Sequence, residues 1–372
     1  MSIADRLGPI SDTEADLLFA GLEHARGIVL AVAGGPASTA LLWLAARWRH
    51  ARPGGPAVIA VTVDHALRPE SRDEAAAVKR IAKACGIAHR TVRWSGVKPG
   101  TGVQKAAREA RYRLLAAAAG RIDADHILTA HTRDDQAATL LMRMSRGSGL
   151  AGLAGMARAA PVPGADGDAL VLLRPFLDVA KARLMATLRE AGIGHADDPS
   201  NRDPRFARVR MRALMPALEQ EGLGSARLAQ LARRLRRADA AIEAVAAAWW
   251  ASHARVHAGD VPAVAFDTTI AALPAEIQLR LLGRGIALCG NEGPVELGKL
   301  ETLQEAVTAA TAAESPLRRT LAGAVVTLDR KGLRVDRAPV RRLPGGKPVR
   351  ASRDPLNHGA SPLPHCGQTA LE

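Results

Sequence analysis

An apolar run that breaks at two glycines and resumes as a helical pattern constrains this chain more than any other feature. Val29–Val32 has the pattern of a buried strand, Gly34-Gly35 that of a turn, and Thr39–Leu44 that of a helix. Glycines let backbone N–H groups approach an anion, and a helix N-terminus adds partial positive charge. The segment therefore predicts a phosphate-binding loop, although paired glycines also serve many strand–helix junctions for backbone reasons alone.

The loop fits neither of two common nucleotide-binding patterns. No lysine follows the glycines as in G-x-x-x-x-G-K-S/T, and their spacing differs from G-x-G-x-x-G. Ser38 offers a hydroxyl near the first helical turn, whereas Ala33 and Ala37 offer only methyl groups. We expect a bound nucleotide to contact six loop residues, namely Ala33, Gly34, Gly35, Pro36, Ala37 and Ser38.

Further strands alternate with helices after this loop. The expected strands are 57–63, 89–94 and 126–130, and the expected helices are 70–85, 104–119 and a segment from 134 onward. Because apolar strands alternate with helices, we predict an α/β fold with a doubly wound parallel sheet. Ligands bind beyond the carboxyl ends of such strands, where this chain carries Asp64-His65 and the polar segment 131–135.

The charge of the chain favours a polyanionic partner. Its 51 lysines and arginines exceed its 37 aspartates and glutamates, which gives a net charge of +14. Such an excess favours nucleic acid through release of counterions from the phosphates. A genome rich in G and C also enriches Arg and Ala, so composition alone leaves this second explanation open. The basic cluster 233–237 either faces RNA or forms a solvated helix face.

The cysteines and the apolar runs bear on where the protein resides. Cys85, Cys289 and Cys366 lie far apart and are odd in number, so they predict neither a disulfide framework nor a C-x-x-C motif. No apolar run reaches 18 residues, and the N-terminus lacks the apolar segment of a signal peptide. We therefore expect a cytoplasmic protein without a membrane partner.

At 372 residues the chain is long enough for two or three domains. The expected regions are an α/β domain over 1–215, a helical region over 216–313, a small β-containing region over 314–340 and a disordered tail over 341–372. Smaller elements expected within them are a helix capped by Ser11 or Asp12, a loop over 157–172, a helix over 174–192 and a β-hairpin over 317–338.

With these strand ends in view, the chain resembles the tRNA(Ile)-lysidine synthase family, a group of PP-loop ATP pyrophosphatases. The resemblance spans residues 25–215, and the opening loop is similar to the S-G-G-x-D-S pyrophosphate loop of that family. Further segments resemble family motifs in the same order, namely Val63–Pro69, Ala107–Tyr112, Ala130–Ala137, Arg146–Leu150, Asp198–Asn201 and Arg208–Arg212. A series in a fixed order is far more specific than any single motif.

The resemblance implies a two-step reaction on tRNA. ATP adenylates the carbonyl at C2 of the wobble cytidine of an isoleucine tRNA and releases pyrophosphate, and the amine of free lysine then displaces AMP. In this scheme residues 1–215 form the catalytic domain, in which the glycine loop holds the pyrophosphate moiety. The helical region 216–313 contacts the tRNA, which the positive charge of the chain suits. The implied ligands and partners are ATP, Mg²⁺, free lysine and tRNA(Ile) with a cytidine at the wobble position, and a homodimer is left open.

The same resemblance assigns roles to residues at the strand ends. The catalytic candidates are Asp64, His131, Asp134 and Asp135. Asp134 and Asp135 are also the candidates for Mg²⁺, because hard oxygen ligands suit that ion. The candidates for contacts with tRNA or phosphate are Arg108, Arg111, Arg208 and Arg212, since guanidinium groups match phosphate oxygens. Plainer roles stay open, with Asp134 as a helix cap and Arg108 and Arg111 as solvated side chains.

Three positions depart from the family pattern, and all three carry alanine. Ala33 stands where the family loop has Ser, Ala37 where it has Asp, and Ala138 where a Glu is expected. Loss of one preorganised electrostatic group commonly costs about 10²–10³ in rate. Two hypotheses follow: an active ligase that compensates with its three remaining aspartates, and a pseudoenzyme that binds tRNA and ATP without turnover. A third, 2-thiolation of tRNA cytidine, usually requires cysteine pairs, which this chain lacks.

Overall fold

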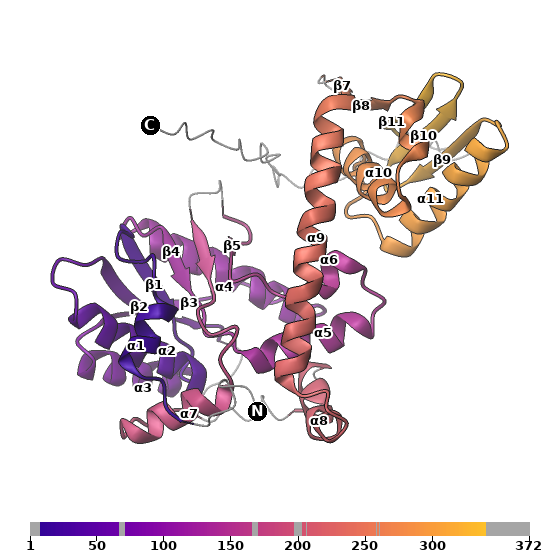
Figure 1. Cartoon of the computed structure of the whole chain (residues 1–372). Helices are drawn as coiled ribbons and strands as arrows, with labels where there is room; N and C mark the ends of the chain where they lie inside the picture. The colour runs from indigo at the N-terminus through magenta and orange to yellow at the C-terminus, as the bar shows by residue number, and fades with distance from the viewer. Residues whose placement is uncertain are drawn as a thin grey trace, which may run out of the picture. The chain divides into compact units, whose positions relative to one another are not determined.

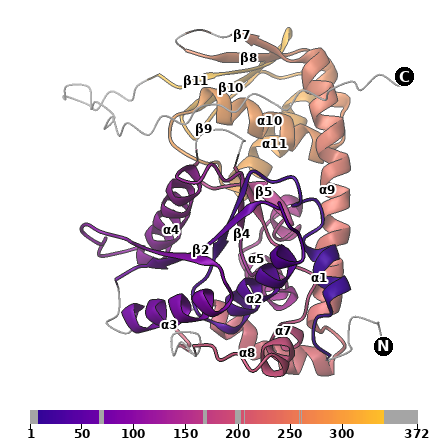
Figure 2. The same ribbon diagram turned by 90° about the vertical axis from the view of Figure 1, so that its left-hand side faces the viewer.

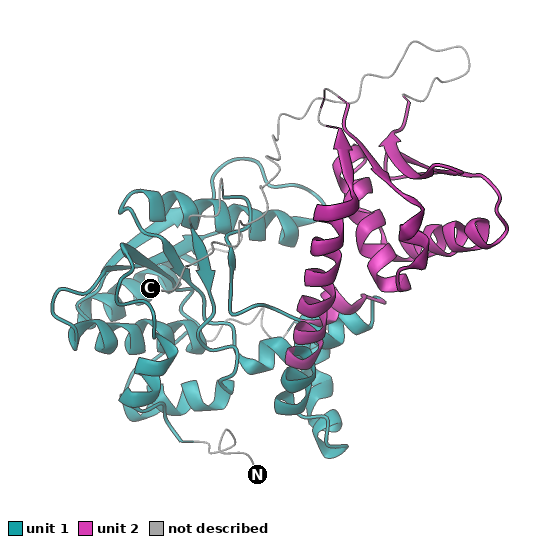
Figure 3. Cartoon of the chain, turned by 45° about the horizontal axis from the view of Figure 1, so that its top comes forward, with its two compact units in different colours: residues 1–146, 155–232, 357–372 teal, residues 147–154, 233–356 magenta. Residues whose placement is uncertain are grey.

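The computed structural model describes residues 8–66, 71–165, 170–196, 203–205, 207–257, 259 and 261–339. These residues form two compact units, coloured in Figure 3: unit 1 comprises 8–146 and 155–232, and unit 2 comprises 147–154 and 233–339. The expected tail and the motif Asp198–Asn201 lie outside the described residues, as do the last three residues of Val63–Pro69. No helix in the described ranges is long and apolar enough to cross a membrane.

Unit 1 is built on a six-stranded sheet with the order β3-β2-β1-β4-β6-β5 (Figure 1). Its strands are β1 (Gly27–Ala31), β2 (Ala57–Asp64), β3 (Ala88–Arg93), β4 (His126–Leu128), β5 (Ala159–Pro161) and β6 (Val171–Leu173). All neighbouring pairs are parallel except β5 and β6, which confirms the predicted α/β fold. The strand order reverses between β1 and β4, and open α/β sheets bind their ligands at such a reversal.

Helices cover both faces of this sheet, as Figure 2 shows for α2 and α3 on one side of β2 and α4 on the other. Ile28 and Leu30 of β1 pack into the layer that contains α2, whereas Val29 and Ala31 pack against α4. The helices of unit 1 are α1 (Asp12–Leu18), α2 (Pro36–His50), α3 (Ser71–Ala84), α4 (Val103–Gly120), α5 (Arg133–Met144), α7 (Lys181–Glu190) and α8 (Ala207–Gln220). β1 is thus buried on both faces, as its sequence predicts.

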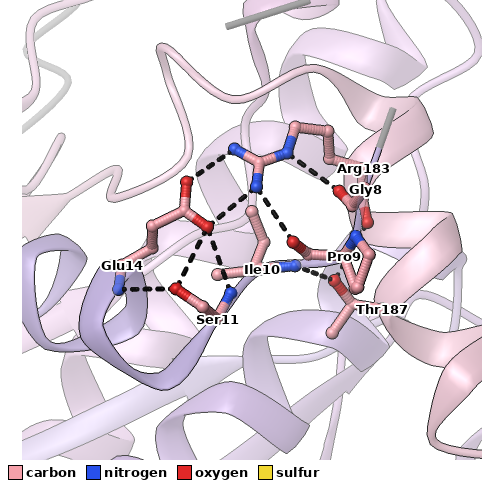
Figure 4. A network of polar contacts seen from close by, with 7 residues as sticks. All are labelled: Gly8, Pro9, Ile10, Ser11, Glu14, Arg183 and Thr187. Atoms are coloured by element: carbon pink, nitrogen blue, oxygen red, sulfur yellow. Dashed lines mark hydrogen bonds and ion pairs between the residues drawn. The ribbon is translucent and has the colours of Figure 1, made fainter. Parts of the chain in front are cut away.

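A network of polar contacts ties the N-terminal segment to α7 (Figure 4). The Arg183 guanidinium donates hydrogen bonds to both carboxylate oxygens of Glu14, each at 2.8 Å. It also donates to the carbonyl oxygens of Gly8 at 3.0 Å and Pro9 at 2.9 Å. The hydrogen bonds from Arg183 lower the pKa of Glu14 to about 2. Ser11 caps α1, as predicted, in a reciprocal pair with Glu14, so the same carboxylate serves both helices.

Unit 2 holds an antiparallel sheet with the order β7-β8-β11-β10-β9. Its strands are β7 (Arg255–His257), β8 (Ala263–Phe266), β9 (Leu317–Leu321), β10 (Ala324–Asp329) and β11 (Gly332–Arg337). Its helices are α6 (Leu150–Leu153), α10 (Ala275–Cys289), α11 (Leu297–Ala312) and the 3₁₀ helix η3 (Thr268–Ala272). The long helix α9 (Ser225–His253) begins in unit 1 and continues into unit 2. Apolar residues of α10, α11 and the sheet form a core that belongs to unit 2 alone.

Several elements differ from the sequence prediction. The segment 157–172, expected as a loop, contains β5 and most of β6, and the helix expected over 174–192 begins only at Lys181. Strands of three residues carry too little alternation to detect, and Pro161 confines β5 to the sheet edge. The region 216–313, expected as helical, also contains β7 and β8. The expected hairpin over 317–338 is a three-stranded meander of β9, β10 and β11.

Candidate functional site

A pocket of about 250 Å³ opens at the carboxyl ends of β1 and β4. The loop after β1 contributes Ala33, Gly35, Pro36, Ala37 and Ser38 to its lining. The segment after β4 contributes 129–132 and Asp135, and three helices add Arg111, Lys181 and Arg212. The structure thus joins the predicted phosphate loop to His131, Asp135 and two of the predicted arginines at the point where the strand order reverses.

The loop between β1 and α2 takes the shape that its glycines allow. Gly34 has a φ of +88°, which residues with a Cβ rarely adopt. Its carbonyl oxygen accepts a hydrogen bond from the Ala196 N–H at 2.9 Å. Ser38 Oγ accepts from the Ala33 N–H at 3.2 Å and donates to the Gly35 carbonyl at 3.0 Å. The Ser38 hydroxyl therefore shapes the loop, which leaves the first-turn N–H groups of α2 available to an anion.

Three helices begin at this pocket. Pro36 and Lys181, the first residues of α2 and α7, line it, and so does Thr132, the N-cap of α5. Each helix N-terminus carries partial positive charge and N–H groups without partners inside the helix. The N-cap residue of α2 is Gly35, which has no side chain to accept hydrogen bonds from the first N–H groups of that helix. Three such termini around one pocket favour a ligand with several negative charges.

Asp135 is held in its ionised form by its neighbours. Its Oδ2 accepts hydrogen bonds from the Thr132 N–H at 2.9 Å and the Thr132 hydroxyl at 3.0 Å. Arg212 Nη2 donates to its Oδ1 at 2.6 Å. Burial opposes the charge, but Arg212 and Thr132 outweigh burial and hold the pKa of Asp135 below its ordinary value. The carboxylate therefore links α5 to α8 beside the pocket.

His131 is neutral at neutral pH. Burial is the largest cause, and it lowers the pKa of His131 to about 3, because the attraction of Asp135 is offset by positive charges that include Arg111. The hydroxyl of Thr129 lies 3.0 Å from His131 Nδ1. The imidazole thus offers a hydrogen bond to a ligand without adding charge.

Comparison with known proteins identifies the family. A family model described as a PP-loop domain matches residues 9–218. The chain is 54% identical over 356 residues to a tRNA(Ile)-lysidine synthase of Bradyrhizobium sp. (strain BTAi1), covering 91% of this chain and 97% of that protein. It is 54% identical over 339 residues to one of Rhodopseudomonas palustris, covering 90% and 96%. The chain belongs to the tRNA(Ile)-lysidine synthase family.

A solved structure resembles the fold of this lysidine synthase family member. The U34-tRNA thiolase NcsA from Methanococcus maripaludis, determined with its 4Fe-4S cluster, superposes with a TM-score of 0.51. The alignment covers 61% of this chain and 77% of that chain at 16% sequence identity. At this identity the likeness concerns the fold alone, and it agrees with the predicted doubly wound sheet.

Two of the predicted catalytic carboxylates lie outside the pocket lining. Asp64 is buried, and its Oδ1 accepts hydrogen bonds from the Ser71 hydroxyl at 2.7 Å and the Ala66 N–H at 2.8 Å. Burial opposes its charge, but these hydrogen bonds and nearby arginines hold the pKa of Asp64 below its ordinary value. Asp134 Oδ2 accepts a hydrogen bond from the Lys181 N–H at 2.8 Å. Asp64 orders the turn after β2, and Asp134 meets the N-terminus of α7 rather than capping its own helix.

Two of the predicted arginines also lie outside the lining. Arg108 is exposed, and its guanidinium carbon lies 5.0 Å from the centre of the Tyr112 ring. Arg208 is half-buried on α8, and its positive charge contributes to the pKa shifts of both His131 and Asp135. Arg208 therefore acts on the site through its charge, whereas Arg111 and Arg212 line it.

The two carboxylates predicted to bind Mg²⁺ make hydrogen bonds within the protein. Within the ranges that the structure describes, no three His, Cys, Asp or Glu side chains gather as metal ligands. Asp134 already accepts the Lys181 N–H, and Asp135 accepts from Thr132 and Arg212. A guanidinium 2.6 Å from Asp135 competes with a metal for the same oxygen. These hydrogen bonds give both candidate ligands a role in orienting their neighbours.

The three alanines that depart from the lysidine synthase pattern lie at or beside the pocket. Ala33 and Ala37 line it. Ala138 is completely buried on α5, three residues after Asp135 and thus on the same side of that helix. The positions at which the family carries a hydroxyl and two carboxylates therefore carry methyl groups here.

Lys181 lines the pocket but was not among the site residues predicted from the sequence. Its ammonium makes no hydrogen bond or ion pair with the residues that the structure describes, and the same holds for the guanidinium groups of Arg111 and Arg208. The N-cap of α7 is Ala180, so no Ser, Thr, Asp or Asn marks the start of that helix. The position of Lys181 after β6 was the one available signal. In a parallel sheet, the residues that begin the helix after a strand lie near the carboxyl end of that strand, where ligands bind.

Proposed function

We propose that this protein is a tRNA(Ile)-lysidine synthase, a ligase that forms a carbon–nitrogen bond. In the first step the oxygen on C2 of the wobble cytidine attacks the α-phosphorus of ATP, and the bond to pyrophosphate breaks. In the second step the amine of free lysine attacks C2, and the bond between C2 and the oxygen of AMP breaks. The products are lysidine, AMP and pyrophosphate.

The observation that carries this proposal is the positive pocket inside the matched PP-loop domain. Arg111, Lys181 and Arg212 line it against the single carboxylate of Asp135, among the residues described. Three helix N-termini add to the positive potential. A triphosphate supplies the negative charge that this arrangement lacks.

The proposed roles follow from the positions of these groups. The loop at the N-terminus of α2 holds the pyrophosphate moiety through backbone N–H groups. Arg111 and Arg212 attract the phosphate oxygens, and Asp135 orients Arg212 through their hydrogen bond. His131 donates or accepts a hydrogen bond at the reacting end without changing the charge of the site.

The proposed partners are those of the lysidine synthase reaction. They are tRNA(Ile) with a cytidine at the wobble position, free lysine and ATP. Mg²⁺ enters on the phosphates of ATP, and Asp134 and Asp135 are the candidates for its protein ligands. The net charge of +14 suits tRNA, and we propose that the reaction takes place in the cytoplasm.

A second candidate function rests on the three alanines. A protein with Ala33, Ala37 and Ala138 keeps the cations that bind ATP and tRNA but lacks three polar groups beside the reacting atoms. Losing one preorganised group costs about 10²–10³ in rate, and losses within one site need not multiply. On this hypothesis the protein binds both substrates and forms little or no lysidine.

The experiment measures incorporation of labelled lysine into tRNA(Ile), together with release of AMP. The unaltered full-length protein is compared with the triple variant Ala33→Ser, Ala37→Asp, Ala138→Glu. If the unaltered protein turns over within about tenfold of the triple variant, the result supports the active ligase. A difference of about tenfold in rate is smaller than the roughly 10²–10³ that the loss of one preorganised group commonly costs. Incorporation by the triple variant alone supports the binding protein, and incorporation by neither overturns the proposed function.

Two controls keep this comparison interpretable. Ala138 is completely buried, so a glutamate there risks destabilising α5, and thermal unfolding of each variant is measured first. Ala37→Asp alone avoids this risk because Ala37 is half-buried in the pocket wall. A tRNA with a different wobble base serves as the substrate control.

A further inference from the structure

We propose that Lys181 is a phosphate-binding residue of the ATP site and that Asp134 positions it by fixing the N-terminus of α7. The proposal rests on the proposed function in one respect, because it takes the triphosphate of ATP as the occupant of the pocket. It assigns a binding role to a residue outside the recognised motif segments and a positioning role to Asp134.

The location of Lys181 supports phosphate binding. It is the first residue of α7 and lines the same pocket as Pro36 and Ala37, the first residues of α2. The two helices pack against each other, with residues of α2 and α7 in one apolar core. Lys181 therefore brings a side-chain charge and a helix N-terminus to the wall of the proposed pyrophosphate loop.

The charges of the described residues around Lys181 leave its ammonium for a ligand. Among those residues, Asp135 is the one carboxylate in the pocket lining, and it is bound to Arg212 at 2.6 Å. Asp134 meets Lys181 through the backbone N–H and not through the ammonium. An ammonium group is a compact charge with three donors, which suits the oxygens of a phosphate.

Asp134 fixes where α7 begins. Its Oδ2 accepts the Lys181 N–H at 2.8 Å, and this is one of the N–H groups that a helix cannot satisfy internally. The N-cap residue, Ala180, has no side chain that makes this bond. Asp134 thus performs from α5 the capping that a local polar residue otherwise supplies, and it ties the start of α7 to the pocket.

The rest of α7 is fixed by the N-terminal segment (Figure 4). Arg183 binds Glu14 through two hydrogen bonds of 2.8 Å, and Thr187 Oγ1 accepts the Ile10 N–H at 2.9 Å. Leu184 and Leu188 are buried in the core beneath the helix. Because α7 is held along its length, Lys181 is presented in one place rather than on a mobile helix end.

The test measures binding of inorganic pyrophosphate and of ATP to the full-length protein by titration calorimetry. Lys181→Met removes the ammonium. The matched control is Arg189→Met, which removes one positive charge from the same helix, because Arg189 is exposed in the last turn of α7. We expect Lys181→Met to weaken both affinities about ten- to a hundredfold, as for a hydrogen bond to a charged group. Arg189→Met is expected to change them less than twofold.

The positioning role is tested by a double-mutant cycle. Asp134→Ala is expected to weaken pyrophosphate binding severalfold in the unaltered protein and to have no further effect in the Lys181→Met background. Asp134→Asn keeps an oxygen that accepts the Lys181 N–H, so it is expected to restore most of the affinity. Fully additive effects of Asp134→Ala and Lys181→Met would overturn the positioning role, because they would show that Asp134 acts independently.

Each remaining outcome decides the proposal without reference to lysidine formation. Pyrophosphate binding that is unchanged in Lys181→Met, or absent from the unaltered protein, would overturn it. Lys181→Met that weakens tRNA binding but not pyrophosphate binding would assign the lysine to a phosphate of tRNA and would also overturn it. A protein that binds pyrophosphate through Lys181 but forms no lysidine would support this inference and contradict only the proposed function.

Discussion

Arg280 in unit 2 and Arg111 in unit 1 are both partly withdrawn from solvent, but their surroundings differ. Arg280 donates to Asp239 at 2.6 Å, and it also binds two glutamates of its own unit. Burial opposes its charge, yet these carboxylates raise the pKa of Arg280, whereas burial lowers the pKa of Arg111. Arg111 has no carboxylate partner among the described residues.

Charged side chains that are withdrawn from water without a partner mark a candidate ligand site. A charge withdrawn from water is unfavourable unless it is paired, so a folded protein normally supplies the partner itself, as unit 2 does for Arg280. The described residues of unit 1 offer Arg111 and Lys181 no such partner. The missing negative charge is then expected from a ligand, and a triphosphate carries enough of it.

The largest expected effect comes from exchanging the two arginines for methionine. Arg280→Met leaves Asp239, Glu243 and Glu276 without their shared cation, and we expect the free energy of unfolding to fall by about 2–3 kcal/mol. Arg111→Met removes a cation that has no carboxylate partner in the described part of the chain, so we expect unchanged or increased stability and ATP binding weakened about ten- to a hundredfold. Denaturant unfolding and calorimetry of both variants measure the two effects.

The comparison fails if the two variants exchange their effects. Loss of stability in Arg111→Met with unchanged ATP affinity would mean that the pocket cations serve the fold. Arg189→Met, exposed on α7, is the control for loss of one positive charge.

A smaller effect is expected from the pH dependence of stability at His131. Its pKa is about 3 in the folded protein and near 6.5 in the unfolded chain, so the unfolded chain takes up a proton first as the pH falls. Stability is therefore lost as the pH drops from about 6.5 towards 3, by up to about 1.4 kcal/mol per pH unit. His131→Asn is expected to remove this slope, which unfolding experiments at several pH values measure. An unchanged slope in the variant would show that His131 is not the neutral buried group described here.

The smallest expected effect is a difference in stability between alanine variants of the two glycines of the loop, Gly34 and Gly35. Gly34→Ala places a Cβ on a residue with φ of +88°, and we expect the free energy of unfolding to fall by about 1–2 kcal/mol. A Cβ on Gly35 meets nothing within 4 Å, so Gly35→Ala is expected to leave stability within about 0.5 kcal/mol. It is expected to weaken ATP binding, because the methyl group stands between phosphate and backbone. Equal stability losses in the two variants would contradict this division.

The fold of unit 1 was largely predictable because its strands are long or apolar enough to show a period. β1 is buried along its whole length, and the glycines that follow it mark the turn to α2. β5 and β6 escaped prediction because each has three residues and the segment around them contains Pro, Gly and Asp. β7 and β8 escaped because they are short runs within a long region whose pattern is otherwise helical and rich in alanine. Their strand structure comes from pairing with neighbours, which no local pattern records.

The sequence predicted part of the site from side chains near the carboxyl ends of strands. His131 and Asp135 come after β4 and line the pocket. Asp64 is the last residue of β2, but its carboxylate accepts hydrogen bonds from Ser71 and Ala66, a local arrangement that the sequence does not reveal. Lys181 was missed because α7 takes its capping hydrogen bond from Asp134, 47 residues earlier.

The cations of unit 1 without a carboxylate partner among the described residues, together with the helix N-termini, are expected to form the site of the triphosphate. An experimental structure of the full-length protein with bound ATP would test this expectation. We expect pyrophosphate-moiety oxygens about 3 Å from the first-turn N–H groups of α2 and from the Lys181 ammonium, with Arg111 also in contact. A triphosphate bound away from the glycine loop, or bound there without contact to any of these cations, would contradict it.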